Sequence, residues 1–151
     1  MSHLIPQRID SSYRGHQLAL WIFGVVASVK ILQSLSVIFN GFSIAKGADG
    51  IPLETFTPAA ARTVVALFAL SALSRLFISL LCLLVLVRYR SAVTFMFAMQ
   101  LLDYLARQLI LHFVPLARTG TPPGPIVNFV LFILTIVGLA LSLWTRRENQ
   151  A

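Results

Sequence analysis

The stretch that decides the fold is residues 63–87, TVVALFALSALSRLFISLLCLLVLV, in which Arg75 is the one charged side chain. An α-helix rises ~1.5 Å per residue, so about 20 apolar residues cross the hydrocarbon core of a bilayer. Lipid offers no hydrogen-bond partner to an open backbone, and a run that crosses it must therefore be helical. The stretch predicts a transmembrane helix with a charge near its centre.

Three further apolar runs make the whole chain an all-α, polytopic membrane protein. The predicted helices, separated by one loop at 40–59 and two short turns, are 18–39, 60–87, 91–114 and 126–144. Apolar residues make up 58% of the 151 residues and charged residues only 11%, against ~25% charged in soluble domains. We therefore expect a single domain, residues 1–151, folded as an antiparallel bundle of four transmembrane helices.

The net charge of +7 is distributed as membrane topology predicts. Loops that stay in the cytoplasm carry an excess of Lys and Arg. If the chain starts in the cytoplasm, six basic residues fall on that side and three on the other, while Lys30, Arg75 and Arg107 lie within the spans. We expect both termini in the cytoplasm and a bacterial inner membrane as the location. The basic residues form no stripe and no known module for nucleic acid, so we expect no such partner.

Turn residues mark the ends of the predicted helices. Asn40 and Gly41 are expected to end the first helix and to open the long loop. Thr57 and Pro58 form an N-cap followed by a proline in the first turn, which predicts the start of the second helix there. Since little more than Arg88-Tyr89-Arg90 links the second and third helices, these two should be antiparallel neighbours.

Two charges should meet across this hairpin. Arg75 lies fourteen residues before Tyr89, and Asp103 lies fourteen residues after it. Equal rise along the two helices brings both side chains to one depth near the bilayer centre. We therefore expect an ion pair between Arg75 and Asp103. Such a pair either serves a function or only fixes which helix neighbours which.

Polar stripes on three helices extend this cluster. Helical spacing places Gln100, Asp103, Tyr104 and Arg107 on one face of the third helix, and Lys30 and Gln33 near the centre of the first. The fourth helix is expected to be an apolar wall. The candidate ligand-binding or proton-linked residues are Lys30, Gln33, Arg75, Gln100, Asp103, Tyr104 and Arg107.

Insertion costs require these charges to face inward. An Arg, Lys or Asp at the centre of a span costs roughly 2.5–3.5 kcal/mol. Three basic residues against the carboxylate of Asp103 also leave an excess of two positive charges. Four explanations are open: a neutral Lys30, side chains that reach toward water, carboxylates from a neighbouring subunit, or a bound anion.

The sequence lacks the residue combinations that disulfide, metal, haem and serine-nucleophile sites require. Cys82 is the single cysteine, so neither an intrachain disulfide nor a CxxC pair can form. His3, His16 and His112 lie too far apart along the spans to converge on one metal or haem. No serine has an adjacent histidine base. We expect no enzyme activity, no metal and no cofactor.

Two functions remain. The first is a non-catalytic membrane subunit or a small-molecule- or lipid-binding bundle built around the charged cluster. The alternative is a small proton-coupled transporter for an anionic or amphipathic substrate, with Asp103 taking up and releasing protons. The expected partners are the lipid bilayer, an anionic or amphipathic ligand, and a membrane protein companion or a second copy of the chain.

Overall fold

The structure is a computed structural model that describes residue 13 and residues 15–144. This part of the chain is all-α: 84% of it is helical, and none of it lies in a strand. The elements in chain order are α1 (Gln17–Gly47), the 3₁₀ turn η1 (Leu53–Thr55), α2 (Pro58–Arg88), the 3₁₀ turn η2 (Arg90–Ala92), α3 (Val93–Phe113) and α4 (Pro123–Leu143).

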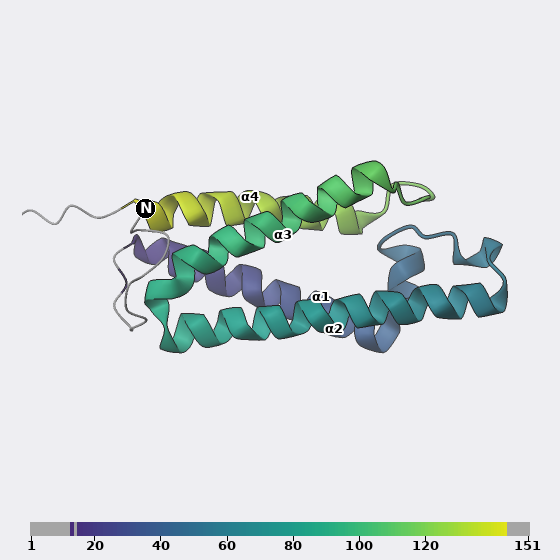
Figure 1. Ribbon diagram of the computed structural model, residues 1–151, viewed down its shortest axis with the longest axis horizontal. Coiled ribbons are helices and arrows are strands. Elements are labelled where there is room, and N and C mark those ends of the chain that lie inside the picture. The colour runs from purple at the N-terminus through teal and green to yellow at the C-terminus, as the bar shows by residue number, and fades with distance from the viewer. Residues whose placement is uncertain (1–12, 14, 145–151) are drawn as a thin grey trace, which may run out of the picture.

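The helices form two pairs that meet at one end and separate toward the middle (Figure 1). α1 packs along α2, α3 packs along α4, and the pairs are joined mainly where α1 contacts α4. α2 and α3 run antiparallel as predicted, but they make few contacts beyond their link at Tyr89. A short link therefore fixed the direction of the two helices without fixing their packing.

Three helices of the described chain, α1, α2 and α4, are long and apolar enough to cross a membrane. Their outer faces carry large apolar side chains that water would not favour, such as Leu67, Leu70 and Phe77, each at least 60% exposed. α3 has the same 21-residue length as α4 but is less apolar, because it carries the polar stripe from Gln100 to Arg107. The fold is that of a membrane protein with at least these three candidate spans.

The first helix does not end at Phe39. Asn40 has non-helical angles (φ −128°, ψ 37°), and the chain then resumes a helix as far as Gly47. Gly41 is buried in this kink, and a Cβ there would lie 3.0 Å from a methyl group of Val65 on α2. The Asn-Gly pair therefore bends α1 against α2 instead of ending it. The predicted loop at 40–59 is correspondingly shorter.

The start of α2 follows the predicted signals. Thr57 is the N-cap, its hydroxyl accepts a hydrogen bond from the backbone N–H of Ala60, and Pro58 lies in the first turn. These two residues satisfy or remove backbone donors that a helix start would otherwise leave unpaired. The preceding segment carries an exposed ion pair between Lys46 and Glu54.

A compact core joins all four helices at the end of the bundle near Tyr89. Phe23 and Phe97 are fully buried and pack edge to face, with ring centroids 4.9 Å apart. Gly138 on α4 lies directly against the Phe97 ring, where a Cβ would clash with it. The backbone N–H of His16 also donates to the carbonyl of Leu141 (3.2 Å), which places the start of α1 beside the end of α4.

At the opposite end, the segment that follows α1 is hydrogen-bonded through its backbone to the turn before α4 and to the first turn of α4. The N–H of Thr119 donates to the carbonyl of Gly50 (2.8 Å), and the N–H of Gly124 donates to the carbonyl of Ala48 (2.8 Å). We call these two bonds the loop clamp. Gly50 is buried with φ +70°, and a Cβ there would lie 2.9 Å from the carbonyl oxygen of Thr119.

Gly50→Ala is expected to open the loop clamp and to lower the free energy of unfolding by about 2 kcal/mol, because it adds left-handed strain to a backbone contact. Gly120→Ala has the same positive φ with open space around it and should show the strain alone, whereas Gly47→Ala should have little effect. Thermal unfolding in detergent measures all three. Equal losses of unfolding free energy for Gly50→Ala and Gly120→Ala would show that the loop clamp contributes nothing to stability.

Candidate central cavity

A cavity of about 610 Å³ lies between the two helix pairs, and all four helices contribute to its wall. It extends from the Phe23–Phe97 core toward the loop clamp, whose residue Asp49 also lines it. The wall contains all seven candidate residues predicted from the polar stripes: Lys30, Gln33, Arg75, Gln100, Asp103, Tyr104 and Arg107. The helices thus turn their polar stripes inward, as the insertion cost requires.

The expected ion pair between Arg75 and Asp103 is not formed. Asp103 instead pairs with Arg107, one turn along α3, with 3.0 Å between Nε and Oδ2. Arg75 Nε donates a long hydrogen bond of 3.4 Å to the carbonyl of Ser71 on its own helix. Because α2 and α3 separate beyond their link, equal depth does not bring the guanidinium to the carboxylate.

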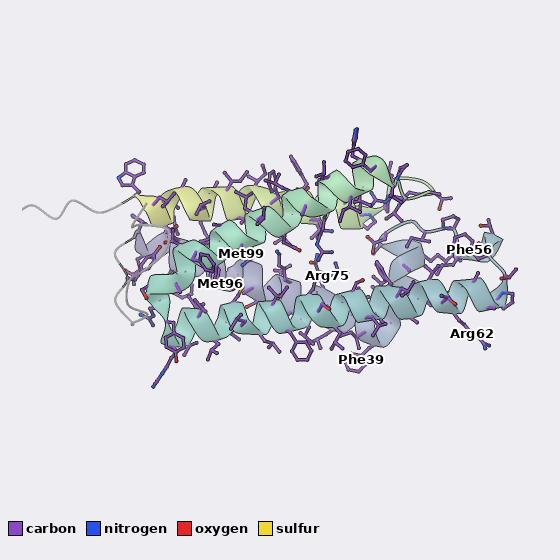
Figure 2. The ribbon with its side chains drawn as sticks, in the orientation of Figure 1. Phe39, Phe56, Arg62, Arg75, Met96 and Met99 are labelled. Carbon is purple, nitrogen blue, oxygen red and sulfur yellow. The ribbon has the colours of Figure 1, made fainter. Side chains whose placement is uncertain are left out.

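Two half-buried cations of the described chain therefore line the cavity without a carboxylate partner. Within the described chain, neither Lys30 Nζ nor the Arg75 guanidinium has a carboxylate oxygen within 4.0 Å. Figure 2 shows the Arg75 side chain extending from α2 into the space between the two helix pairs. Desolvated cations without counterions are costly, so this arrangement favours an anion in the cavity.

Gln100 adds an unsatisfied polar group to the wall. Its side chain is buried, at 4% exposure, and its Nε2 donates to the sulfur of Cys82 at 3.4 Å. Its Oε1 has no hydrogen-bond partner among the described residues. A thiol is a weak acceptor, so Gln100 gives up little when its amide turns toward another group.

The fourth helix supplies more than the expected apolar wall. Asn128, Phe132 and Thr135 of α4 line the cavity. The ring of Phe132 stacks on Tyr104 with centroids 4.2 Å apart, and the Thr135 hydroxyl donates to the carbonyl of Leu131 (2.7 Å). Asn128 was missed because a lone amide near a helix start resembles an interfacial residue.

Two charged residues outside the helices, Asp49 and Arg118, also line the cavity at the clamp end. Burial raises the pKa of the Asp49 carboxyl above its ordinary value, while the positive charges of Arg118 and Arg75 act in the opposite direction. Asp49 lies within the predicted loop at 40–59, in a segment with Gly47, Gly50 and Pro52, and these neighbours indicate a turn and give no sign of a cavity. With these two included, four basic residues face two acidic ones, and the excess of two positive charges remains.

The raised pKa of Asp49 predicts a pH dependence of stability. A carboxyl whose pKa is raised by folding stabilises the folded state while it is protonated, and this contribution is lost as the pH rises through the raised value. The melting temperature of the wild type should therefore rise relative to that of Asp49→Asn when the pH falls from about 7 to about 4. The difference between the two proteins isolates Asp49 from other carboxyls. A wild type that loses stability relative to the variant on acidification would contradict the burial of Asp49.

Among the described residues, no three His, Cys, Asp or Glu side chains lie close enough together to hold a metal ion. Cys82 is buried and free. What the cavity offers is cationic donors, amides and apolar surface. Such groups can bind and orient a ligand, and among the described residues they include no nucleophile with an adjacent histidine base.

Comparison with models of known protein families, with curated proteins and with solved structures finds no match to this chain.

Proposed function

We propose that this protein is an integral membrane protein that binds a small anionic ligand in its central cavity, as a non-catalytic binding protein or as the binding subunit of a membrane complex. The observation that carries the proposal is the pair of cations, Lys30 and Arg75, that line one cavity without a carboxylate partner among the described residues; we call them the unpartnered cations. An anion in contact with both would offset the excess positive charge. The volume of about 610 Å³ lies within the range of ~300–1,000 Å³ typical of small-molecule sites.

In this proposal α3 is the fourth span. Its cavity face carries the polar stripe, but its outer face exposes large apolar side chains, including Leu105, Leu109 and Ile110, each at least 50% exposed. It runs between the same two ends of the bundle as the other helices (Figure 1). The distribution of Arg and Lys supports cytoplasmic termini and a bacterial inner membrane. Labelling of single cysteines from each side of the membrane, in a Cys82→Ser background, tests this topology.

The experiment that tests the binding function is identification of the ligand that accompanies the protein. Native mass spectrometry of the protein extracted in mild detergent should detect an anionic adduct, and Lys30→Met should lose that adduct while remaining folded. An adduct that persists in Lys30→Met and in Arg75→Gln would refute binding through the unpartnered cations. A stable protein companion in the same spectrum would identify the complex of which this chain is a subunit.

A proton-coupled transporter is the second candidate. Asp103 favours a transporter, because this carboxylate lies in the cavity wall and its side chain is 42% exposed. An arriving anion can compete for Arg107 and so free the Asp103 carboxylate from its ion pair. Uptake of the identified anion into liposomes, driven by a pH gradient and abolished by Asp103→Asn, would support transport. Binding without gradient-driven uptake supports the binding protein.

A further inference from the structure

The cavity wall is not polar throughout. Where α2 and α3 separate, the wall consists of large apolar side chains that are also 39–58% exposed: Ile78, Leu81, Phe95, Met99 and Leu102. Figure 2 shows Arg75 on α2 and Met99 on α3 on either side of the space between these helices. Since the outer surface of the bundle faces lipid, this part of the cavity borders the acyl chains.

The other boundaries of the cavity are packed. α1 contacts α4 on the far side, the Phe23–Phe97 core fills one end, and the loop clamp joins the loops at the other. Few contacts join α2 to α3 beyond Tyr89. The boundary between α2 and α3 is thus the one that a molecule from the bilayer can cross with the least rearrangement.

We propose that the ligand is an amphiphile with a phosphate or carboxylate head group and an acyl chain, and that it enters from the bilayer between α2 and α3. The head group binds Lys30 and Arg75, and the acyl chain lies between Ile78 and Leu102. This inference rests on the proposed function and adds the class of ligand and its route.

Charge and polarity in the cavity fit such a molecule better than a compact, water-soluble anion. A guanidinium binds the paired oxygens of a carboxylate or phosphate, and an ammonium binds either as a point charge. These cations line the same cavity as the exposed apolar side chains at the boundary between α2 and α3. A soluble anion would leave that apolar surface unfilled.

Gln100 is a second, independent sign of a polar occupant. Its buried Oε1 is unsatisfied, and its Nε2 has only the weak bond to Cys82 to lose. When the amide turns by 180°, its oxygen can accept from the Cys82 thiol and its NH₂ group faces away from the sulfur, available to a head-group oxygen. An apolar occupant would give this group no partner.

A groove between α1 and α2 serves as a comparison within the same molecule. It has a similar volume of about 650 Å³ and is lined mainly by apolar side chains such as Leu20, Val25 and Leu83. Its charged residue is Arg90, which is exposed at the end of the helix pair. Any lipid can occupy such a groove, so binding there should not depend on the head group.

The test is a binding series with the full-length protein in detergent, followed by native mass spectrometry. The probes are a long-chain fatty acid, phosphatidic acid, their soluble counterparts butyrate and glycerol phosphate, and phosphatidylcholine as a zwitterionic control. The long-chain acids should bind at least about tenfold more tightly than their soluble counterparts. Arg75→Gln should remove this binding and leave that of phosphatidylcholine unchanged. Comparison of the two long-chain acids identifies whether the head group is a carboxylate or a phosphate.

The route is tested by narrowing the boundary between α2 and α3. Leu102→Trp should weaken binding of the long-chain acids at least about tenfold, because the larger ring occupies the place of the acyl chain. Leu109→Trp is the matched control, since Leu109 lies on the same helix, is equally exposed at 58%, and is not part of the cavity wall. Leu81→Trp repeats the test from α2 if Leu102→Trp fails to fold.

The outcomes distinguish the proposed binding function from the proposed amphiphilic ligand and its route of entry. Long and short acids that bind equally, with dependence on Arg75, would retain the binding function and overturn the amphiphile. If Leu102→Trp and Leu109→Trp change the affinity for the long-chain acids equally, the proposed entry between α2 and α3 is wrong. If phosphatidylcholine binds with the same affinity as phosphatidic acid, and if its binding also requires Arg75, the proposal that the head group is anionic is wrong. If no probe requires Arg75, both the function and this inference are wrong.

Discussion

Arg75→Gln is expected to weaken the binding of an anionic ligand at least about thirtyfold, since removal of one partner from a buried charge pair costs ~2–5 kcal/mol and ~1.4 kcal/mol is a factor of ten. Arg75 is the unpartnered cation that α2 brings to the cavity. Titration of the purified protein with the ligand found by mass spectrometry measures the change. Arg75→Lys keeps the charge and should retain part of the affinity.

Arg62→Gln is the matched control for this variant. Arg62 lies on the same helix, is exposed, and lies far from Arg75 near the start of α2 (Figure 2). It should bind the ligand as the wild type does. Equal losses of affinity in the two variants would mean that Arg75 acts only through the overall charge.

Stability provides a second readout for Arg75→Gln. If an ion pair of Arg75 with Asp103 held the bundle together, the variant would unfold more easily. The structure has no such pair, and removal of an uncompensated charge from the interior should instead leave the ligand-free protein as stable or more stable. A large loss of stability without ligand would therefore favour a structural role.

Gly138→Ala is expected to produce the largest loss of stability, about 2–3 kcal/mol, because one added carbon overpacks a fully buried contact. Its Cβ would clash with the ring of Phe97, which is held in place by Phe23. The contact joins α1, α3 and α4, so no single helix can move away without loss of packing. Thermal unfolding in detergent measures the loss.

Two variants establish that the Phe97 contact is the cause. Ala140→Val adds bulk to an exposed position on the same helix and should unfold like the wild type. Phe97→Leu combined with Gly138→Ala should recover part of the loss, since the smaller side chain makes room for the added carbon. Additive losses in the double variant would show that the two residues are not coupled.

The sequence was sufficient for the helical class and for the polar residues that α1, α2 and α3 contribute near the middle of the cavity. Periodicity predicts which face of a helix is polar, and insertion cost requires that face to point inward, so Lys30, Arg75 and Asp103 were placed in one cavity. Both arguments depend on local spacing and on depth. Neither needs the angle between helices.

What the sequence did not predict depends on that angle. The pairing of Arg75 with Asp103 was wrong because depth says nothing of the lateral distance between two helices that separate. The continuation of α1 beyond Asn40 depends on the contact of Gly41 with Val65, which no local signal reveals. Asp49 and Asn128 joined the cavity through the packing of loops and helix ends that are distant in sequence.

The contacts that join the two helix pairs differ between the two ends of the molecule. At one end, the edge-to-face rings of Phe23 and Phe97 interlock three helices, whereas at the other, two backbone hydrogen bonds hold Ala48 and Gly50 to the opposite loop. Water can replace the partner of a broken hydrogen bond, whereas the close packing of buried rings is lost when they separate. We therefore expect the two helix pairs to separate more readily at the loop clamp than at the aromatic core.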